Sequence, residues 1–120
     1  MRKIITFLII AISIYLCQTT ALVAEGKREL PQSSVKAIED LIRQDAIYIE
    51  SYYDVYFDPD IWSLMEVRVK KTFTKALATY CGNKAGADNS GEYYYYCTVY
   101  DKMSGKKIAK CDAWGFKVYQ

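Results

Sequence analysis

The side chains of this chain that could do chemistry are four cysteines and three closely spaced aspartates, and the sequence has no histidine. The lack of histidine excludes Ser–His and Cys–His catalytic pairs and removes the commonest protein ligand of metal ions. The spacing of the cysteines matches no zinc motif, and no glycine-rich loop could hold a phosphate. We therefore expect no catalytic residue, no bound metal and no cofactor.

The three aspartates are Asp54, Asp58 and Asp60. Such a group of carboxylates could hold calcium or carry out acid–base chemistry. However, Pro59 favours the first turn of a helix, where Asp58 would cap free backbone amides and Asp60 would interact with the helix dipole. Capping is the preferred interpretation, and a small hydrolase that uses these carboxylates is only the third functional hypothesis.

Three cysteines lie beyond the N-terminal segment, and their pairing depends on a predicted hairpin. A loop at residues 103–105, with glycine in its last position, sets Cys97 opposite Cys111 at a spacing that a disulfide accepts. Such a bond would stabilise the domain by about 2–4 kcal/mol. A Cys81–Cys97 bond is the alternative. The odd thiol is expected to be buried, with a disulfide-linked dimer as the other outcome.

The N-terminus has the form of a secretory signal peptide. Two basic residues at positions 2–3 precede an uncharged, largely apolar stretch over residues 4–24 that ends in small side chains. We therefore predict a cleaved signal peptide over residues 1–24 and a secreted or periplasmic protein. The alternatives are an uncleaved membrane anchor, which would be the only contact with a membrane, and a lipid on Cys17.

The rest of the chain is long enough for one domain. We expect a polar leader over residues 25–34 and a single α+β domain over residues 35–120. Its predicted architecture is two N-terminal helices packed on a small antiparallel sheet, which is the C-terminal β-hairpin, with a disulfide as a staple.

The helices are predicted from the spacing of apolar side chains. A repeat of three and four residues over residues 35–56 indicates one amphipathic helix. A second helix is expected to begin at Asp58 and Pro59 and to stop at Gly82, which can adopt the left-handed conformation. A strand over residues 65–74 is the rival interpretation of the second segment.

Tyrosine is unusually frequent, with twelve in the chain. In the predicted hairpin, one face carries large side chains: Tyr94, Tyr96, Tyr100, Ile108, Trp114 and Phe116. The other face carries several smaller ones: Tyr93, Tyr95, Cys97, Val99, Ala109, Cys111 and Ala113. If the helices cover the first face, its aromatic rings form the core. If they cover the second, an aromatic surface faces solvent and suits a protein or sugar partner.

Charge is unevenly distributed. Residues 25–66 hold ten acidic and four basic side chains, and residues 67–120 hold four acidic and ten basic ones. This pattern indicates either two complementary halves or a dipolar surface. We expect a non-catalytic module that binds another exported or envelope protein, as an inhibitor, immunity-type or accessory factor. A carbohydrate or small-ligand binder is the second hypothesis, and nucleic acid is not an expected partner. The predicted binding residues are Tyr94, Tyr96, Trp114 and Phe116, with Lys106, Lys107 and Lys110 at the rim.

Overall fold

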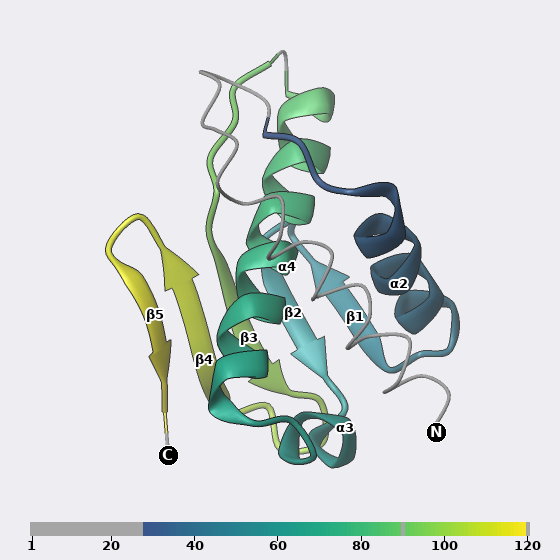
Figure 1. Ribbon diagram of the computed structural model, residues 1–120, viewed down its shortest axis with the longest axis vertical. Coiled ribbons are helices and arrows are strands. Elements are labelled where there is room, and N and C mark those ends of the chain that lie inside the picture. Colours follow the sequence, from purple (N-terminus) through teal and green to yellow (C-terminus); the bar gives the residue numbers. More distant parts are fainter. Residues whose placement is uncertain (1–27, 90, 120) are drawn as a thin grey trace.

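The computed structural model describes residues 28–89 and 91–119, so the predicted signal peptide lies outside the described residues. Within these described residues, three helices and five strands follow one another (Figure 1). They are α2 (Gln32–Arg43), β1 (Ile47–Glu50), β2 (Asp54–Phe57), α3 (Pro59–Ser63), α4 (Val67–Asp88), β3 (Cys97–Asp101), β4 (Lys107–Asp112) and β5 (Gly115–Val118). None of the described helices is long and apolar enough to cross a membrane.

The strands form one sheet in the order β1-β2-β3-β4-β5. Neighbouring strands are antiparallel except β2 and β3, which are parallel and are joined through α3 and α4. The predicted α+β class is therefore confirmed, with helices packed on a sheet. The prediction of a small antiparallel hairpin sheet was wrong, because the sheet has five strands and one parallel pair.

The first predicted helix stops less than halfway along its apolar repeat. α2 ends at Arg43, and Asp45 adopts a left-handed φ of 60°. The amide of Ala46 donates to the carbonyl of Leu41 at 2.9 Å, which closes the helix end in a Schellman arrangement. Glycine usually occupies this left-handed position, so its absence concealed the helix end. Residues 47–57 then form the β1–β2 hairpin and not more helix.

The second predicted helix begins as expected and then continues beyond its predicted end. The Asp58 carboxylate accepts a hydrogen bond from the Asp60 amide at 2.8 Å, and Pro59 occupies the first turn of α3. The chain leaves the helical conformation at residues 64–66 before α4 begins, and the Met65 side chain of this bend is buried in the core. Gly82 is no stop: it lies inside α4, which runs on to Asp88.

Two glycines in α4 allow the following segment to cross the helix closely. A Cβ atom on Gly82 would lie 2.5 Å from the Tyr95 ring and 2.7 Å from the Tyr94 carbonyl oxygen. A Cβ atom on Gly86 would lie 2.1 Å from the Tyr93 ring. Glycine is therefore required here by packing and not by backbone conformation. The two tyrosine rings stack in parallel at 6.3 Å along this side of the helix.

We predict that Gly86→Ala destabilises the domain although alanine favours helix. The propensity gain is about 1 kcal/mol, whereas forcing the Tyr93 ring off the helix should cost about 1–3 kcal/mol. The measurement is urea unfolding followed by circular dichroism. Ala87→Gly, at an exposed position of the same helix turn, is the matched control and should lose about 1 kcal/mol from propensity alone. A stabilised Gly86→Ala variant would show that Tyr93 does not pack on α4.

The predicted register of the C-terminal hairpin is confirmed in its centre. Cys97 lies opposite Cys111, and Val99 lies opposite Ala109. Near the turn the register shifts by a β-bulge, so that Tyr100 lies opposite Lys107 and not opposite Ile108. Gly105 has the expected positive φ of 76°. Its amide donates to the Asp101 carbonyl at 2.7 Å, which closes a loop one residue longer than predicted.

Candidate binding face of the sheet

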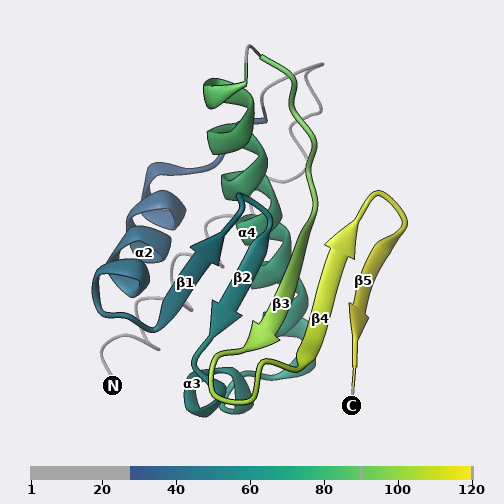
Figure 2. The ribbon, with the colours of Figure 1, turned by 180° about the vertical axis from the view of Figure 1, so that it is seen from behind.

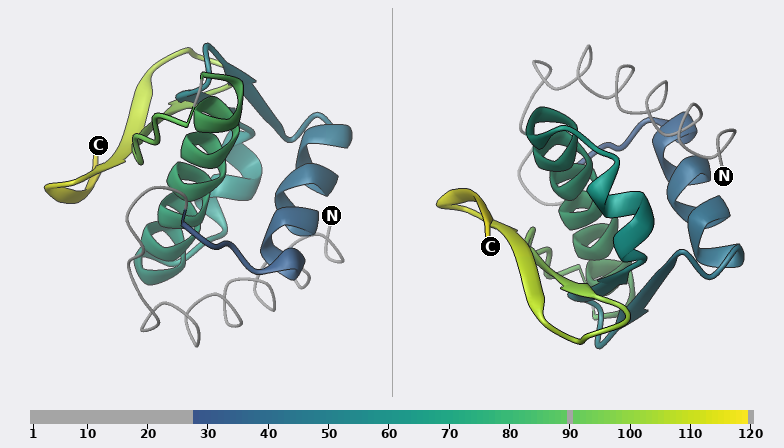
Figure 3. Two further views of the ribbon diagram at one scale, coloured as in Figure 1. Left: turned by 90° about the horizontal axis from the view of Figure 1, so that it is seen from above. Right: turned by 90° about the horizontal axis from the view of Figure 1, so that it is seen from below.

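The helices cover one face of the sheet. Seen from behind, the strands lie in front of α4, and no helix of the described residues lies over them (Figure 2). Views from above and below place α2 and α4 on the same side of the sheet (Figure 3). The covered face is the one with small side chains: Cys97, Val99, Ala109 and Cys111 are buried. Of the two arrangements that the sequence left open, the structure has the second. We call the helix-free side of the sheet the open face.

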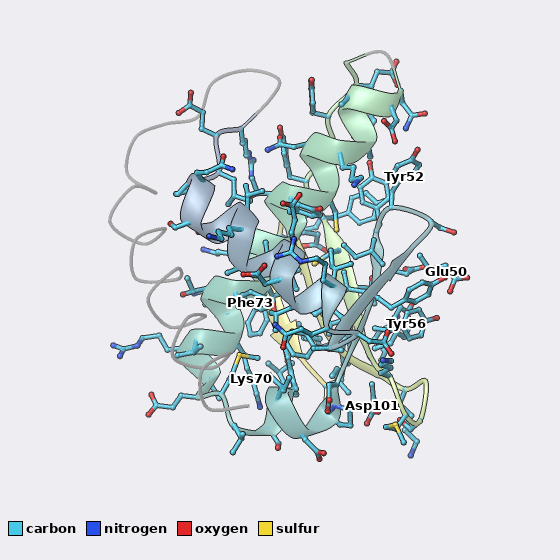
Figure 4. The ribbon with its side chains drawn as sticks, turned by 90° about the vertical axis from the view of Figure 1, so that its right-hand side faces the viewer. Glu50, Tyr52, Tyr56, Lys70, Phe73 and Asp101 are labelled. Carbon is cyan, nitrogen blue, oxygen red and sulfur yellow. The ribbon has the colours of Figure 1, made fainter. Side chains whose placement is uncertain are left out.

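A row of tyrosines crosses the open face. Tyr48, Tyr56 and Tyr100 are direct partners on β1, β2 and β3. Their ring centroids are 6.1 Å and 5.0 Å apart, and the second pair is stacked. The Tyr48 side chain is 52% exposed. Tyr56 points away from the helices, whereas Phe73 lies between α4 and the sheet (Figure 4). The open face therefore presents aromatic rings to solvent across three strands.

The turn between β1 and β2 fixes one end of this face. Ser51 and Tyr52 both have a positive φ, of 52° and 69°, which is a strained conformation for residues other than glycine. The Tyr52 hydroxyl donates to the Asp88 carboxylate at 2.8 Å, so the turn is held against the end of α4. The Tyr53 ring stacks on Tyr96 with centroids 4.1 Å apart. These contacts hold the turn in its strained form.

A second row of the open face is charged. It has one residue on each of the five strands, and each residue is the cross-strand partner of the next. From β1 to β5 these residues are Glu50, Asp54, Thr98, Lys110 and Lys117. We call these five residues the charged row. Its β1–β2 side is acidic, and its β4–β5 side is basic. Glu50 lies on the side of the sheet away from the helices (Figure 4). The uneven charge of the sequence thus becomes a charge separation along one row of side chains.

The electrostatics of the face follow from these positions. Lys110 forms an exposed salt bridge of 3.4 Å with Asp112 on its own strand. Among the described residues, Glu50 and Asp54 form no salt bridge. The pKa of Tyr100 is raised, chiefly by desolvation and further by the neighbouring Asp54 carboxylate, which its hydroxyl contacts. The Lys117 ammonium lies 5.1 Å from the centre of the Tyr119 ring.

The structure brings together only some of the predicted binding residues. Lys110 lies on the open face, Lys107 lies opposite Tyr100, and Lys106 is exposed just before β4. Tyr96 is also exposed, but its ring stacks on Tyr53, which packs against the core. Phe116 was placed wrongly. It pairs with Cys111 and packs against the core, because the β4–β5 register puts it on the covered face.

Tyr94 and Trp114 are exposed, but they lie outside the strands and are not cross-strand partners as a longer hairpin would make them. Residues 92–96 form no strand, since they cross α4 at its glycines, and β4 ends at Asp112. Trp114 lies instead in the β4–β5 turn, where its amide donates to the Asp112 carboxylate at 2.8 Å. Its side chain is 94% exposed, and that of Tyr94 is 58% exposed. Neither residue belongs to the core.

Comparisons of this chain with protein-family models, curated proteins and solved structures found no match. The description of the site therefore comes from the chain's own residues alone. The sequence interpretation missed Tyr48, Tyr56, Glu50, Asp54 and Lys117 as members of a common face. The signal was the alternation of isoleucine with polar side chains over residues 47–50, which has the period of a half-buried strand.

The predicted disulfide is not formed. Cys81, Cys97 and Cys111 are free and buried, and none lies at disulfide distance from another. Although Cys97 lies opposite Cys111, its thiol points toward α4 and donates to the Thr74 carbonyl at 3.5 Å. Cross-strand proximity of two backbones is therefore insufficient when the side chains point elsewhere. The staple that the sequence predicted is absent from the described fold.

Burial raises the pKa of all three thiols. For Cys81, desolvation and then the Asp54 carboxylate raise it to about 12. For Cys97, desolvation is again the first cause, followed by the neighbouring Cys81 and Cys111. Since only a thiolate is a good nucleophile or metal ligand, these side chains act as small core residues.

The aspartates of the hydrolase hypothesis are dispersed. Asp58 caps α3, whereas Asp54 lies at the opposite end of β2 and faces Tyr100. Asp60 is exposed on α3. Within residues 28–89 and 91–119, no group of three or more His, Cys, Asp or Glu side chains is placed to hold a metal ion.

Proposed function

We propose that the chain is an exported, non-catalytic module that binds another protein of the envelope or the extracellular space through the open face. The observation that carries this proposal is a sheet face without helices that exposes a row of tyrosines beside charged side chains. Tyrosine and tryptophan give large contact areas at low entropic cost and dominate binding energy at protein interfaces. The N-terminal segment, with its signal-peptide pattern, supports the location.

Trp114 supports the same proposal from an independent position. A tryptophan that is 94% exposed at the tip of a turn contributes nothing to the described core. The exposed ring leaves a large apolar surface in contact with water. Burial of this surface against a partner would contribute about 25 cal/mol of free energy per Å². The turn is tied by the Asp112–Trp114 hydrogen bond, so the ring is presented on a fixed backbone. Such a side chain is suited to anchor a partner at the β4–β5 end of the open face.

The test is affinity capture from an envelope and secreted extract of the protein's own source. The bait is the exported protein, in the form in which it is isolated from cells. The unmodified protein should retain a stoichiometric protein partner, and a Tyr48→Ala/Trp114→Ala variant should lose most of it. The matched control is Leu64→Ala/Val67→Ala, because both are exposed apolar side chains that lie at the helix junction and not on the open face. Equal capture by both variants, or loss by both, would contradict a role for the open face.

Carbohydrate binding is the second candidate. The stacked and partly exposed rings of Tyr56 and Tyr100 favour it, since aromatic surfaces of this kind also contact sugar rings. A soluble glycan that changes Trp114 fluorescence, and that fails to do so in a Tyr48→Ala/Tyr56→Ala variant, would replace the protein partner by a sugar. No change with any glycan would leave the protein partner as the better proposal.

A further inference from the structure

The charged row contains two local conflicts. Glu50 and Asp54 are direct cross-strand partners, and so are Lys110 and Lys117. Like charges that lie directly opposite each other on one face of a sheet destabilise it. Lys110 is partly compensated by Asp112, but the two carboxylates have no cationic partner among the described residues. The charged row thus contains two unfavourable pairs of like charges. Natural proteins keep such local conflicts chiefly at functional sites, so the pairs indicate a functional surface.

The two conflicts have opposite sign and are placed symmetrically. The acidic pair lies on β1 and β2, the basic pair lies on β4 and β5, and the neutral Thr98 lies between them on the central strand β3. If the row is followed from β5 to β1 instead of from β1 to β5, each acidic position is replaced by a basic one and each basic position by an acidic one. A surface with this property is complementary to itself.

We infer that the partner of the open face is a second copy of this chain, packed face to face about a two-fold axis that runs along β3. This axis places β1 of one copy over β5 of the other and β2 over β4. Glu50 then faces Lys117 of the second copy, Asp54 faces Lys110, and Thr98 faces its own equivalent. This inference rests on the proposed function, because it names the protein that the open face binds.

The alternative two-fold arrangement is disfavoured by the same charges. An axis across the strands would set β1 on β1 and β5 on β5, so that acid would face acid and base would face base. The axis along β3 also agrees with the packing of twisted sheets, whose strand directions stay within about 30° of each other. It brings the Tyr100 rings of the two copies together near the axis, where contact area is most effective.

The size of the face sets the expected strength. Five strands about 4.8 Å apart and four residues long give a footprint of roughly 300 Å² per copy in projection, or about 600 Å² for both copies. This is smaller than the roughly 1,200 Å² of total area at which stable specific interfaces begin. We therefore expect association with a dissociation constant in the micromolar range or weaker. Because the four ion pairs are exposed at their edges, the association should weaken as salt increases.

The experiment is sedimentation velocity on the exported protein, isolated from cells, over a range of concentrations at low salt. The unmodified protein should pass from monomer to dimer. Glu50→Lys/Asp54→Lys and Lys110→Glu/Lys117→Glu should each bind themselves at least about tenfold more weakly, since every cross-copy pair becomes repulsive. An equal mixture of the two variants should restore the dimer, because each Lys of one variant then faces a Glu or Asp of the other. Carrying all four substitutions in one chain should also restore it.

The controls separate this inference from folding and from the proposed function. Lys71→Glu/Lys75→Glu makes the same charge change on exposed positions of α4 and should leave the dimer intact. Circular dichroism checks that every variant is folded. A monomer at all concentrations, or a mixture that fails to associate, overturns self-association. If capture of a different protein still depends on Tyr48 and Trp114 in that case, the proposed function stands without it.

Discussion

Replacing Phe57 with alanine should lower the free energy of unfolding by about 3–5 kcal/mol, a large share of the stability of a small domain. The Phe57 side chain is fully buried, and its ring makes edge contacts with Trp62 and Phe73 at 5.4 Å and 5.6 Å. Alanine would remove these contacts and leave a cavity between the sheet and α4. The measurement is the urea midpoint and slope at one pH.

Tyr56→Ala is the informative comparison. Its ring lies on the open face, so its loss should cost only about 1 kcal/mol, from stacking and partial burial. A helix over this segment, as the apolar repeat predicts, would instead bury Tyr53 and Tyr56. A larger loss for Tyr56→Ala than for Phe57→Ala would therefore contradict the β1–β2 hairpin.

The three thiols of the domain should resist a thiol reagent in the native state and react fully after unfolding. At pH 8 a pKa of about 12 leaves about one Cys81 in ten thousand as thiolate, against about one in ten at the ordinary value of 9.0. The side chain is also buried, so the native rate should fall at least about a thousandfold. Full-length Cys17→Ser protein, treated with Ellman's reagent with and without urea, provides the measurement.

The number of reactive thiols distinguishes the two descriptions of the core. Three in urea without reductant agree with free cysteines, whereas one would mean that a disulfide had formed. The raised pKa values also set a pH dependence. Because the folded state holds these protons more tightly than the unfolded state, their contribution to stability is complete below pH 9 and is lost as the pH rises toward about 12.

The parts of the fold with explicit local signals could be predicted. Asp58 and Pro59 mark the start of α3, and the glycine loop at Gly105 gives the centre of the C-terminal hairpin. The two faces of the C-terminal hairpin could be distinguished by the size of their side chains, but the sequence left open which of them lies under the helices.

The rest was concealed by residues in unusual roles. The left-handed conformation is adopted by Asp45, Ser51 and Tyr52, whereas glycine or asparagine would have indicated a turn at these positions. The sequence therefore predicted helix through the end of α2 and the β1–β2 turn. Gly82 looked like a helix stop, whereas contact with Tyr95 requires it inside α4. The parallel β2–β3 pair joins segments about forty residues apart, and no local pattern specifies it.

The central claim is that two copies of this protein bind each other through the open face, and amide chemical shifts can locate this contact directly. We would record two-dimensional ¹H–¹⁵N spectra from about 10 µM to about 1 mM at low salt. The account predicts concentration-dependent shifts at Glu50, Asp54, Tyr100, Lys110 and Lys117, with α2 and the outer side of α4 unchanged. Shifts confined to the helices, or spectra that do not change with concentration, would contradict it.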